Sequence, residues 1–121
     1  MDKWQALQSF WSGFSLPAYD ENSVPTTATF PYITYAAASG ALDEVLNMSA
    51  SLWYSSTSWA AVSQKAEEIS ESIAKGMPIP LNVGYLWITR GDPFAQRMGD
   101  PDDPAIKRIY INIQAECLTS W

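Results

Sequence analysis

The sequence of 121 residues contains no histidine and only one cysteine, Cys117. The absence of histidine excludes Ser-His-Asp and Cys-His catalytic arrangements and removes the commonest general base. A single cysteine excludes an internal disulfide, and without histidine it also excludes the ordinary structural zinc sites. Gly84, Gly91 and Gly99 are too far apart in the sequence to form a glycine-rich phosphate loop. We therefore expect a protein that is not an enzyme and that has no metal or cofactor.

Basic residues and long apolar runs are also scarce. Seven Lys and Arg stand against 13 Asp and Glu, which gives a formal net charge of −6. Because affinity for nucleic acid depends on clustered Lys and Arg, this balance argues against a protein that clamps DNA or RNA. No apolar run approaches the roughly 20 residues that span a bilayer, and the N-terminus lacks the pattern of a signal peptide. With one cysteine, these features predict a protein of the reducing cytosol and no membrane contact.

What the chain does have is a large aromatic content in a short sequence. It contains six Trp, six Tyr and four Phe, and 47% of its residues are hydrophobic. The length predicts one domain over residues 1–121, large enough to fold unaided. So many aromatic residues in a small domain predict a dense core together with surfaces that contact partners.

Two segments, Lys3–Ser15 and Trp59–Lys75, have the spacing of amphipathic helices. Their apolar residues recur at intervals of three and four: Trp4, Leu7, Trp11 and Phe14 in the first, and Trp59, Val62, Ala66, Ile69 and Ile73 in the second. Asp2 is the expected N-cap of the first helix. Gly76 and Pro78 are expected to end the second.

Four segments have the composition or the alternation of strands. They are Phe30–Ala38, Val45–Tyr54, Asn82–Thr89 and Lys107–Leu118. In the last, every second residue from Ile109 is apolar, which predicts one buried face and one wetter face. Residues 39–44 have the composition of a turn, and Tyr19–Thr29 that of a loop. The sequence therefore predicts an α+β fold in helix-hairpin-helix-hairpin order, with one mainly antiparallel four-stranded sheet and the helices packed on one face.

The connection between the last two predicted strands, Arg90–Pro104, is unusually long for a hairpin. Hairpin connections usually have about 2–5 residues, and much longer ones are generally functional or disordered. This one carries Arg, Phe and Met, which are enriched at protein interfaces. We therefore predict a docking arm whose candidate contact residues are Arg90, Asp92, Phe94, Gln96, Arg97, Met98, Asp100, Asp102 and Asp103.

The aspartates of this connection also admit a second interpretation. Asp100, Asp102 and Asp103 have side chains that bind Ca²⁺ or Mg²⁺ in other proteins. The segment lacks the glycine at position six and the distal glutamate of a calcium loop. We therefore expect a solvated turn, in which the Asp-Pro pairs initiate the change of direction.

Five blocks together cover most of the chain: Ala18–Asn22, Phe30–Tyr35, Ala50–Trp59, Gly84–Met98 and Ile106–Tyr110. The block Gly84–Met98 is long and unusual, and it continues with Asp100-Pro101. In these blocks the sequence resembles the tail terminator proteins of long-tailed phages and prophages, in the small branch found in Gram-positive hosts.

The resemblance implies a small α/β domain whose subunits form a six-membered ring, either in solution or only when monomers dock. Such a ring binds the end of the growing tail tube, stops its polymerisation and joins it to the head connector. It would act in the host cytoplasm during assembly and remain in the tail or neck of the virion. DNA passes through the ring without specific binding. Six subunits at −6 would give the ring a net charge of about −36, which would repel the phosphate backbone. The family has no catalytic motif that could be carried over to this sequence.

Two other functions remain compatible with the sequence. One is a different neck component, such as a head–tail connector or stopper, which shares the chemistry of ring-forming adaptors. The other is an intracellular module that binds a small ligand or a peptide. A hexameric ring in micrographs, or tails that do not stop at a set length when the gene is deleted, favours the tail terminator. A monomer at high concentration that binds a metabolite favours the ligand-binding module.

Overall fold

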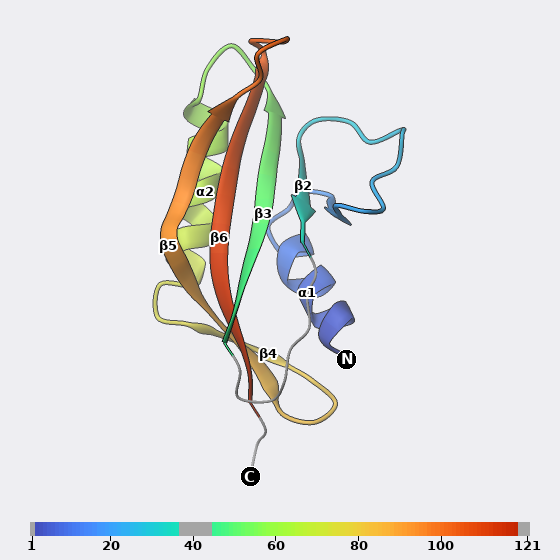
Figure 1. Ribbon diagram of the computed structural model, residues 1–121, viewed down its shortest axis with the longest axis vertical. Helices are drawn as coiled ribbons and strands as arrows, with labels where there is room; N and C mark the ends of the chain where they lie inside the picture. The colour runs from blue at the N-terminus through green and yellow to red at the C-terminus, as the bar shows by residue number, and fades with distance from the viewer. Residues whose placement is uncertain (1, 37–44, 119–121) are drawn as a thin grey trace.

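The computed structural model describes residues 2–36 and 45–118. Within them the elements follow in the order α1 (Lys3–Ser12), β1 (Ala18–Asp20), β2 (Tyr32–Tyr35), β3 (Val45–Ser55), α2 (Ala60–Ser72), β4 (Met77–Pro80), β5 (Tyr85–Gly99) and β6 (Ile106–Leu118). The strands form one sheet in the order β1-β2-β3-β6-β5-β4. Only β1 and β2 pair in parallel, so the sheet is mixed, and it curves into a half-barrel (Figure 1).

The prediction of a four-stranded, mainly antiparallel sheet in helix-hairpin-helix-hairpin order is therefore wrong. Two short strands were missed: β1 overlaps the start of the expected loop Tyr19–Thr29, and β4 lies between the second predicted helix and the third predicted strand. β1 extends the sheet beside β2, with Ala18 opposite Ile33. β4 contains Pro78 and Pro80, which an edge strand tolerates because one side of it needs no hydrogen bonds. The predicted turn at residues 39–44 lies outside the described residues.

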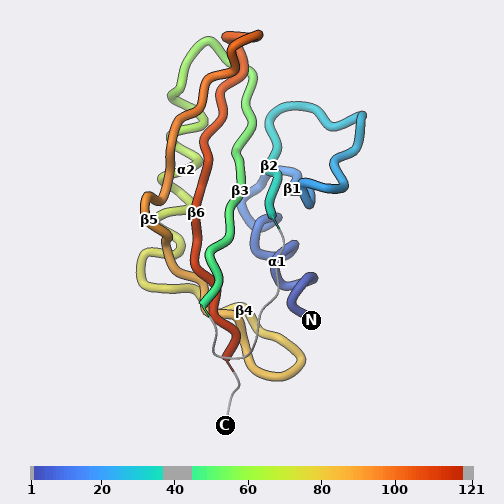
Figure 2. The backbone as a smooth tube through the Cα atoms, viewed as in Figure 1, coloured from blue at the N-terminus to red at the C-terminus, as the bar shows by residue number. Residues whose placement is uncertain are grey.

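The predicted loop Arg90–Pro104 is also wrong over most of its length, because β5 continues to Gly99. Its second half pairs with β6 from Ala95 opposite Ile111 to Gly99 opposite Lys107. Only residues 100–105 form the turn, and Figure 2 shows β5 and β6 side by side up to it. Gly91 and Pro93 fall in a bulge between Arg90 and Ala95, where the pairing register shifts. A bulge accommodates glycine and proline without ending a strand, which is why these residues did not mark a loop.

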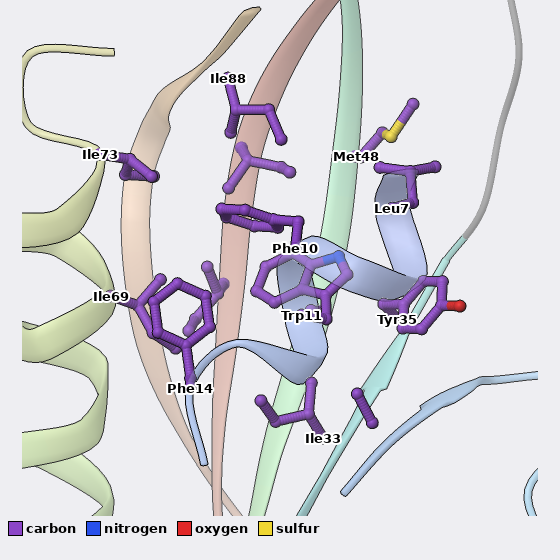
Figure 3. Close-up of a cluster of buried hydrophobic side chains, with 14 of the residues drawn as sticks. Leu7, Phe10, Trp11, Phe14, Ile33, Tyr35, Met48, Ile69, Ile73 and Ile88 are labelled. Carbon is purple, nitrogen blue, oxygen red and sulfur yellow. The ribbon is translucent and has the colours of Figure 1, made fainter. Parts of the chain in front are cut away.

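The strand residues that face the helices form one core with them. Its members include Leu7, Phe10 and Trp11 of α1, Ile69 of α2, and the alternate residues Ile109, Ile111 and Ile113 of β6. Figure 3 shows Phe14 beside Ile69, and Trp11 beside Tyr35 of β2. The Trp11 and Tyr35 rings stack with centroids 6.5 Å apart. Both helices thus cover the same face of the half-barrel.

A capping box fixes where the first helix begins, and a lysine of the second helix binds the segment that follows it. Asp2 and Gln5 form a capping box, in which Asp2 Oδ1 accepts from Gln5 N at 2.8 Å, as predicted for this N-cap. The helix ends at Ser12, before the predicted Ser15. Beyond that end, Lys65 Nζ of α2 donates to the Phe14 carbonyl at 2.8 Å and pairs with Glu68 at 2.9 Å.

A buried tyrosine links α1 to the sheet, and its ionisation at alkaline pH should lower the stability of the fold. The Tyr35 hydroxyl donates to Gln8 Oε1, and Gln8 Nε2 donates to the Ala18 carbonyl at 2.9 Å. Burial raises the pKa of the Tyr35 hydroxyl, and the charge of Asp20 adds to this effect. Burial and then the charge of Glu68 also raise the pKa of Tyr54. The folded chain therefore holds these protons more tightly than the unfolded chain does.

We expect the free energy of unfolding to be insensitive to these tyrosines below pH about 10, their ordinary pKa, and to fall as the pH rises further. Urea denaturation at pH 8 and at pH 10.5 measures the difference. In Tyr35→Phe the alkaline loss should be smaller, because one of the two groups is removed. Tyr85→Phe, a half-buried tyrosine of β5, is the matched control. Equal alkaline losses in wild type and Tyr35→Phe would contradict this prediction.

Candidate interaction surface

The face of the sheet that points away from the helices carries two rows of cross-strand neighbours. The first row contains Met98, Arg108, Trp53 and Tyr32, each directly opposite the next on β5, β6, β3 and β2. The second contains Gln96, Tyr110, Ser51 and Thr34 on the same strands. We call these eight residues the open face. Facing pairs on one side of a sheet have Cβ atoms only about 4.5–5.5 Å apart, so each row forms a continuous surface.

The first row is a stack of aromatic rings that ends on an arginine. The Arg108 guanidinium lies 4.7 Å from the Trp53 ring centroid and 5.6 Å from that of Tyr110. The Trp53 and Tyr32 rings stack with centroids 6.3 Å apart and an interplanar angle of 21°. Tyr19 and Phe30 continue the aromatic surface at 6.0 and 5.4 Å from Tyr32. Cation–π and ring contacts thus run across four strands.

Hydrogen bonds to the second row hold these side chains in one orientation. Arg108 Nε donates to Ser51 Oγ at 3.0 Å, and Trp53 Nε1 donates to Thr34 Oγ1 at 2.8 Å. Ser51 is only 4% exposed although it points away from the core, because the larger side chains beside it cover it. The open face is therefore preorganised, which lowers the entropy lost when a partner binds.

The arginines of the β5–β6 hairpin contact hydroxyl groups instead of carboxylates. Arg90 donates to Ser70 Oγ at 3.1 Å and Arg97 to Ser63 Oγ at 3.2 Å, as Arg108 does to Ser51. Among the residues that the structure describes, no carboxylate lies within 4.0 Å of these three guanidinium groups. In a chain with 13 acidic residues, the hairpin thus holds positive charges that no ion pair within residues 2–36 and 45–118 neutralises.

The structure distributes the nine predicted contact residues over several environments and does not bring them together. Only Gln96 and Met98 belong to the open face. Arg90 and Arg97 reach α2, and Arg97 lies 5.2 Å from the Trp59 ring centroid. Phe94 packs against the core, whereas Asp92 is exposed in the bulge.

The three aspartates of the predicted arm lie in the turn. Asp100 Oδ1 accepts from the backbone N–H groups of Asp102 and Asp103, at 2.8 and 3.1 Å. Asp103 Oδ1 accepts from Ala105 N at 2.9 Å. These carboxylates therefore shape the turn, while the Asp102 side chain is exposed.

A hollow of about 150 Å³ lies between the first row and the hairpin turn. Its lining includes Trp53, Met98, Asp100 and Arg108. Pockets for small ligands usually have about 300–1,000 Å³, so this hollow suits one or two side chains of a partner better than a metabolite.

The main residues of the open face were not identified as a site from the sequence. Alternation along the last strand places Arg108 and Tyr110 on the other face of the strand from the isoleucines. It does not show which residues of neighbouring strands they contact. Their contact with Trp53 and Tyr32 depends on the pairing of β6 with β3 and of β3 with β2. The signal available in the sequence was the concentration of aromatic residues in the segments Phe30–Tyr35 and Ala50–Trp59.

Comparison with known proteins gives no match, either to a protein-family model or to a curated protein. In the described part of the chain, neither helix is long and apolar enough to cross a membrane.

Proposed function

We propose that this chain is a non-enzymatic assembly protein of a long-tailed phage or prophage. It forms a ring that caps the tail tube and joins the tube to the head connector. The ring assembles in the host cytoplasm and remains in the neck of the virion. The resemblance of Gly84–Met98 and the other sequence blocks to tail terminator proteins supports this function.

The observation that carries the proposal is the open face. It combines Trp, Tyr and Arg in a rigid central arrangement, which is the composition of binding hot spots in protein interfaces. The hollow beside it is too small for a typical metabolite. The chain therefore has a better surface for a protein partner than for a small ligand. The net charge of −6 per subunit would let DNA pass without adhering.

Deletion of this gene from the phage or prophage that encodes it should produce tails that grow beyond their set length and carry no heads. Electron microscopy of lysates measures both. A plasmid copy of the wild-type gene should restore tails of uniform length joined to heads. Trp53→Ala should fail to do so although it remains folded, because it removes the centre of the first row.

The matched control is Trp4→Ala, which removes an exposed tryptophan of α1 outside the open face and should complement fully. Tails of normal length without heads would instead favour a connector or stopper. Normal virions in the deletion strain would refute an assembly role.

A further inference from the structure

Resting on the proposed function, we infer that subunits join head to tail, with the acidic outer side of α2 of one copy seated on the open face of the next. The occupant of the open face is thus a second copy of this chain. Arg108 receives the carboxylates of Glu67 and Glu71 of that copy.

The charge at the centre of the open face specifies the kind of partner. Arg108 is the only charged residue in the two rows, and its described contacts are two aromatic rings and a serine hydroxyl. A guanidinium group gains most from a carboxylate, with which it forms strong charge-assisted hydrogen bonds. The partner surface must therefore present carboxylates together with enough area to cover the Trp53 and Tyr32 rings.

The outer side of α2 provides such carboxylates. Glu67 and Glu71 are exposed, and at a spacing of four residues they lie on one stripe, about 5–6 Å apart. Three other carboxylates are engaged within the chain: Glu68 with Lys65, Asp2 with Gln5, and Asp100 in the hairpin turn. The stripe therefore offers two adjacent carboxylates in one place.

The dimensions of the two surfaces also match. The 13 residues of α2 make a helix of roughly 20 Å. The first row crosses four strands spaced by about 4.8 Å, a width of roughly 14 Å. A helix laid along the row would cover it from Met98 to Tyr32.

The charges also select the symmetry of the contact. Two open faces placed together would bring two Arg108 groups into contact, and two α2 stripes would bring four glutamates together. Both symmetric dimers are therefore opposed by like charge. The stripe and the open face lie on opposite sides of the sheet, because α2 covers the core face (Figure 1). Contacts between opposite sides of identical subunits are heterologous, and they close into a ring when the rotation permits.

Charge reversal of each surface tests this arrangement, with self-association measured by sedimentation over a range of concentrations. Arg108→Glu alone, and Glu67→Lys with Glu71→Lys together, should each weaken association on the order of 30-fold or more. A one-to-one mixture of the two variants should associate again, because every contact in an alternating ring then pairs opposite charges. The triple variant should also associate on its own.

Three controls make the result specific. Arg108→Gln removes the charge without reversing it and should weaken association less. Glu116→Lys changes the charge by the same amount at the far end of β6 and should leave association unchanged. Circular dichroism confirms that each variant is folded.

Several outcomes would overturn the head-to-tail contact. Retained association in either reversed variant would do so, as would a mixture that stays dissociated. Retained association of the variant with Glu67→Lys and Glu71→Lys would indicate two open faces in contact, because that contact does not involve the stripe. A wild-type chain that stays monomeric at millimolar concentration would also reject it, whereas the proposed capping function would still be decided separately by the tail-length assay.

Discussion

Ile111→Asp should abolish the folded state at room temperature. Ile111 is fully buried in β6, the strand between β3 and β5, where it lies opposite Ala50 and Ala95. A carboxylate at this position would have no hydrogen-bond partner in the core, and the space left by the isoleucine side chain adds to the loss. We expect a destabilisation of roughly 4 kcal/mol or more, which is comparable to the total stability of many domains, about 5–15 kcal/mol. Loss of the cooperative urea transition, followed by circular dichroism, measures it.

The matched control is Gln114→Asp on the same strand. Gln114 is exposed on the side away from the helices, so the same new charge is solvated there. We expect the free energy of unfolding to change by no more than about 1 kcal/mol. At an exposed position the substitution only replaces glutamine by a residue with a lower strand preference. A cooperative transition of normal midpoint in Ile111→Asp would contradict the assignment of this residue to the core.

The elements with strong local patterns could be predicted from the sequence. β3, observed at Val45–Ser55, and β6, at Ile106–Leu118, differ from their predicted bounds by one residue. Their alternation is long enough to specify both the strand and its buried face. α2 was predicted for the same reason, since its apolar residues repeat over more than three turns. Local spacing determined these elements without knowledge of the rest of the fold.

The order of the strands could not be predicted, because it depends on pairings between distant residues. β6 lies between β3 and β5, so the two expected hairpins share one sheet through β3 and β6. Short strands such as β1 have too few residues for a period to be recognised. The glycine and proline residues of β5 are compatible with two structures. Judged from the local sequence alone they indicate a loop, but beside a partner strand that continues past them they form a bulge. The pairing of β5 with β6 decides that this segment is a bulge.

The candidate site was hidden for the same reason. Its residues come from four strands, and the stack of Arg108, Trp53 and Tyr32 exists only in the observed register. A shift of one residue in β3 would turn Trp53 toward the core and remove the row. Two residues of the arm predicted from composition, Gln96 and Met98, belong to the open face. The centre of the open face lies on β6, β3 and β2, which were predicted as strands but not as contact segments.

Gly76→Ala should destabilise the chain by about 2–4 kcal/mol, although it adds a single methyl group. Gly76 follows α2 with φ of 84°, where an L-residue with a Cβ is strained. A Cβ there would also come within 2.1 Å of Trp87 Cζ2, so the indole ring of β5 would have to move. Gly99→Ala is the matched control, because a Cβ at Gly99 would meet nothing within 4 Å. Urea denaturation of both variants measures the difference, and equal stability would show that Trp87 does not pack over the turn that leads from α2 into β4.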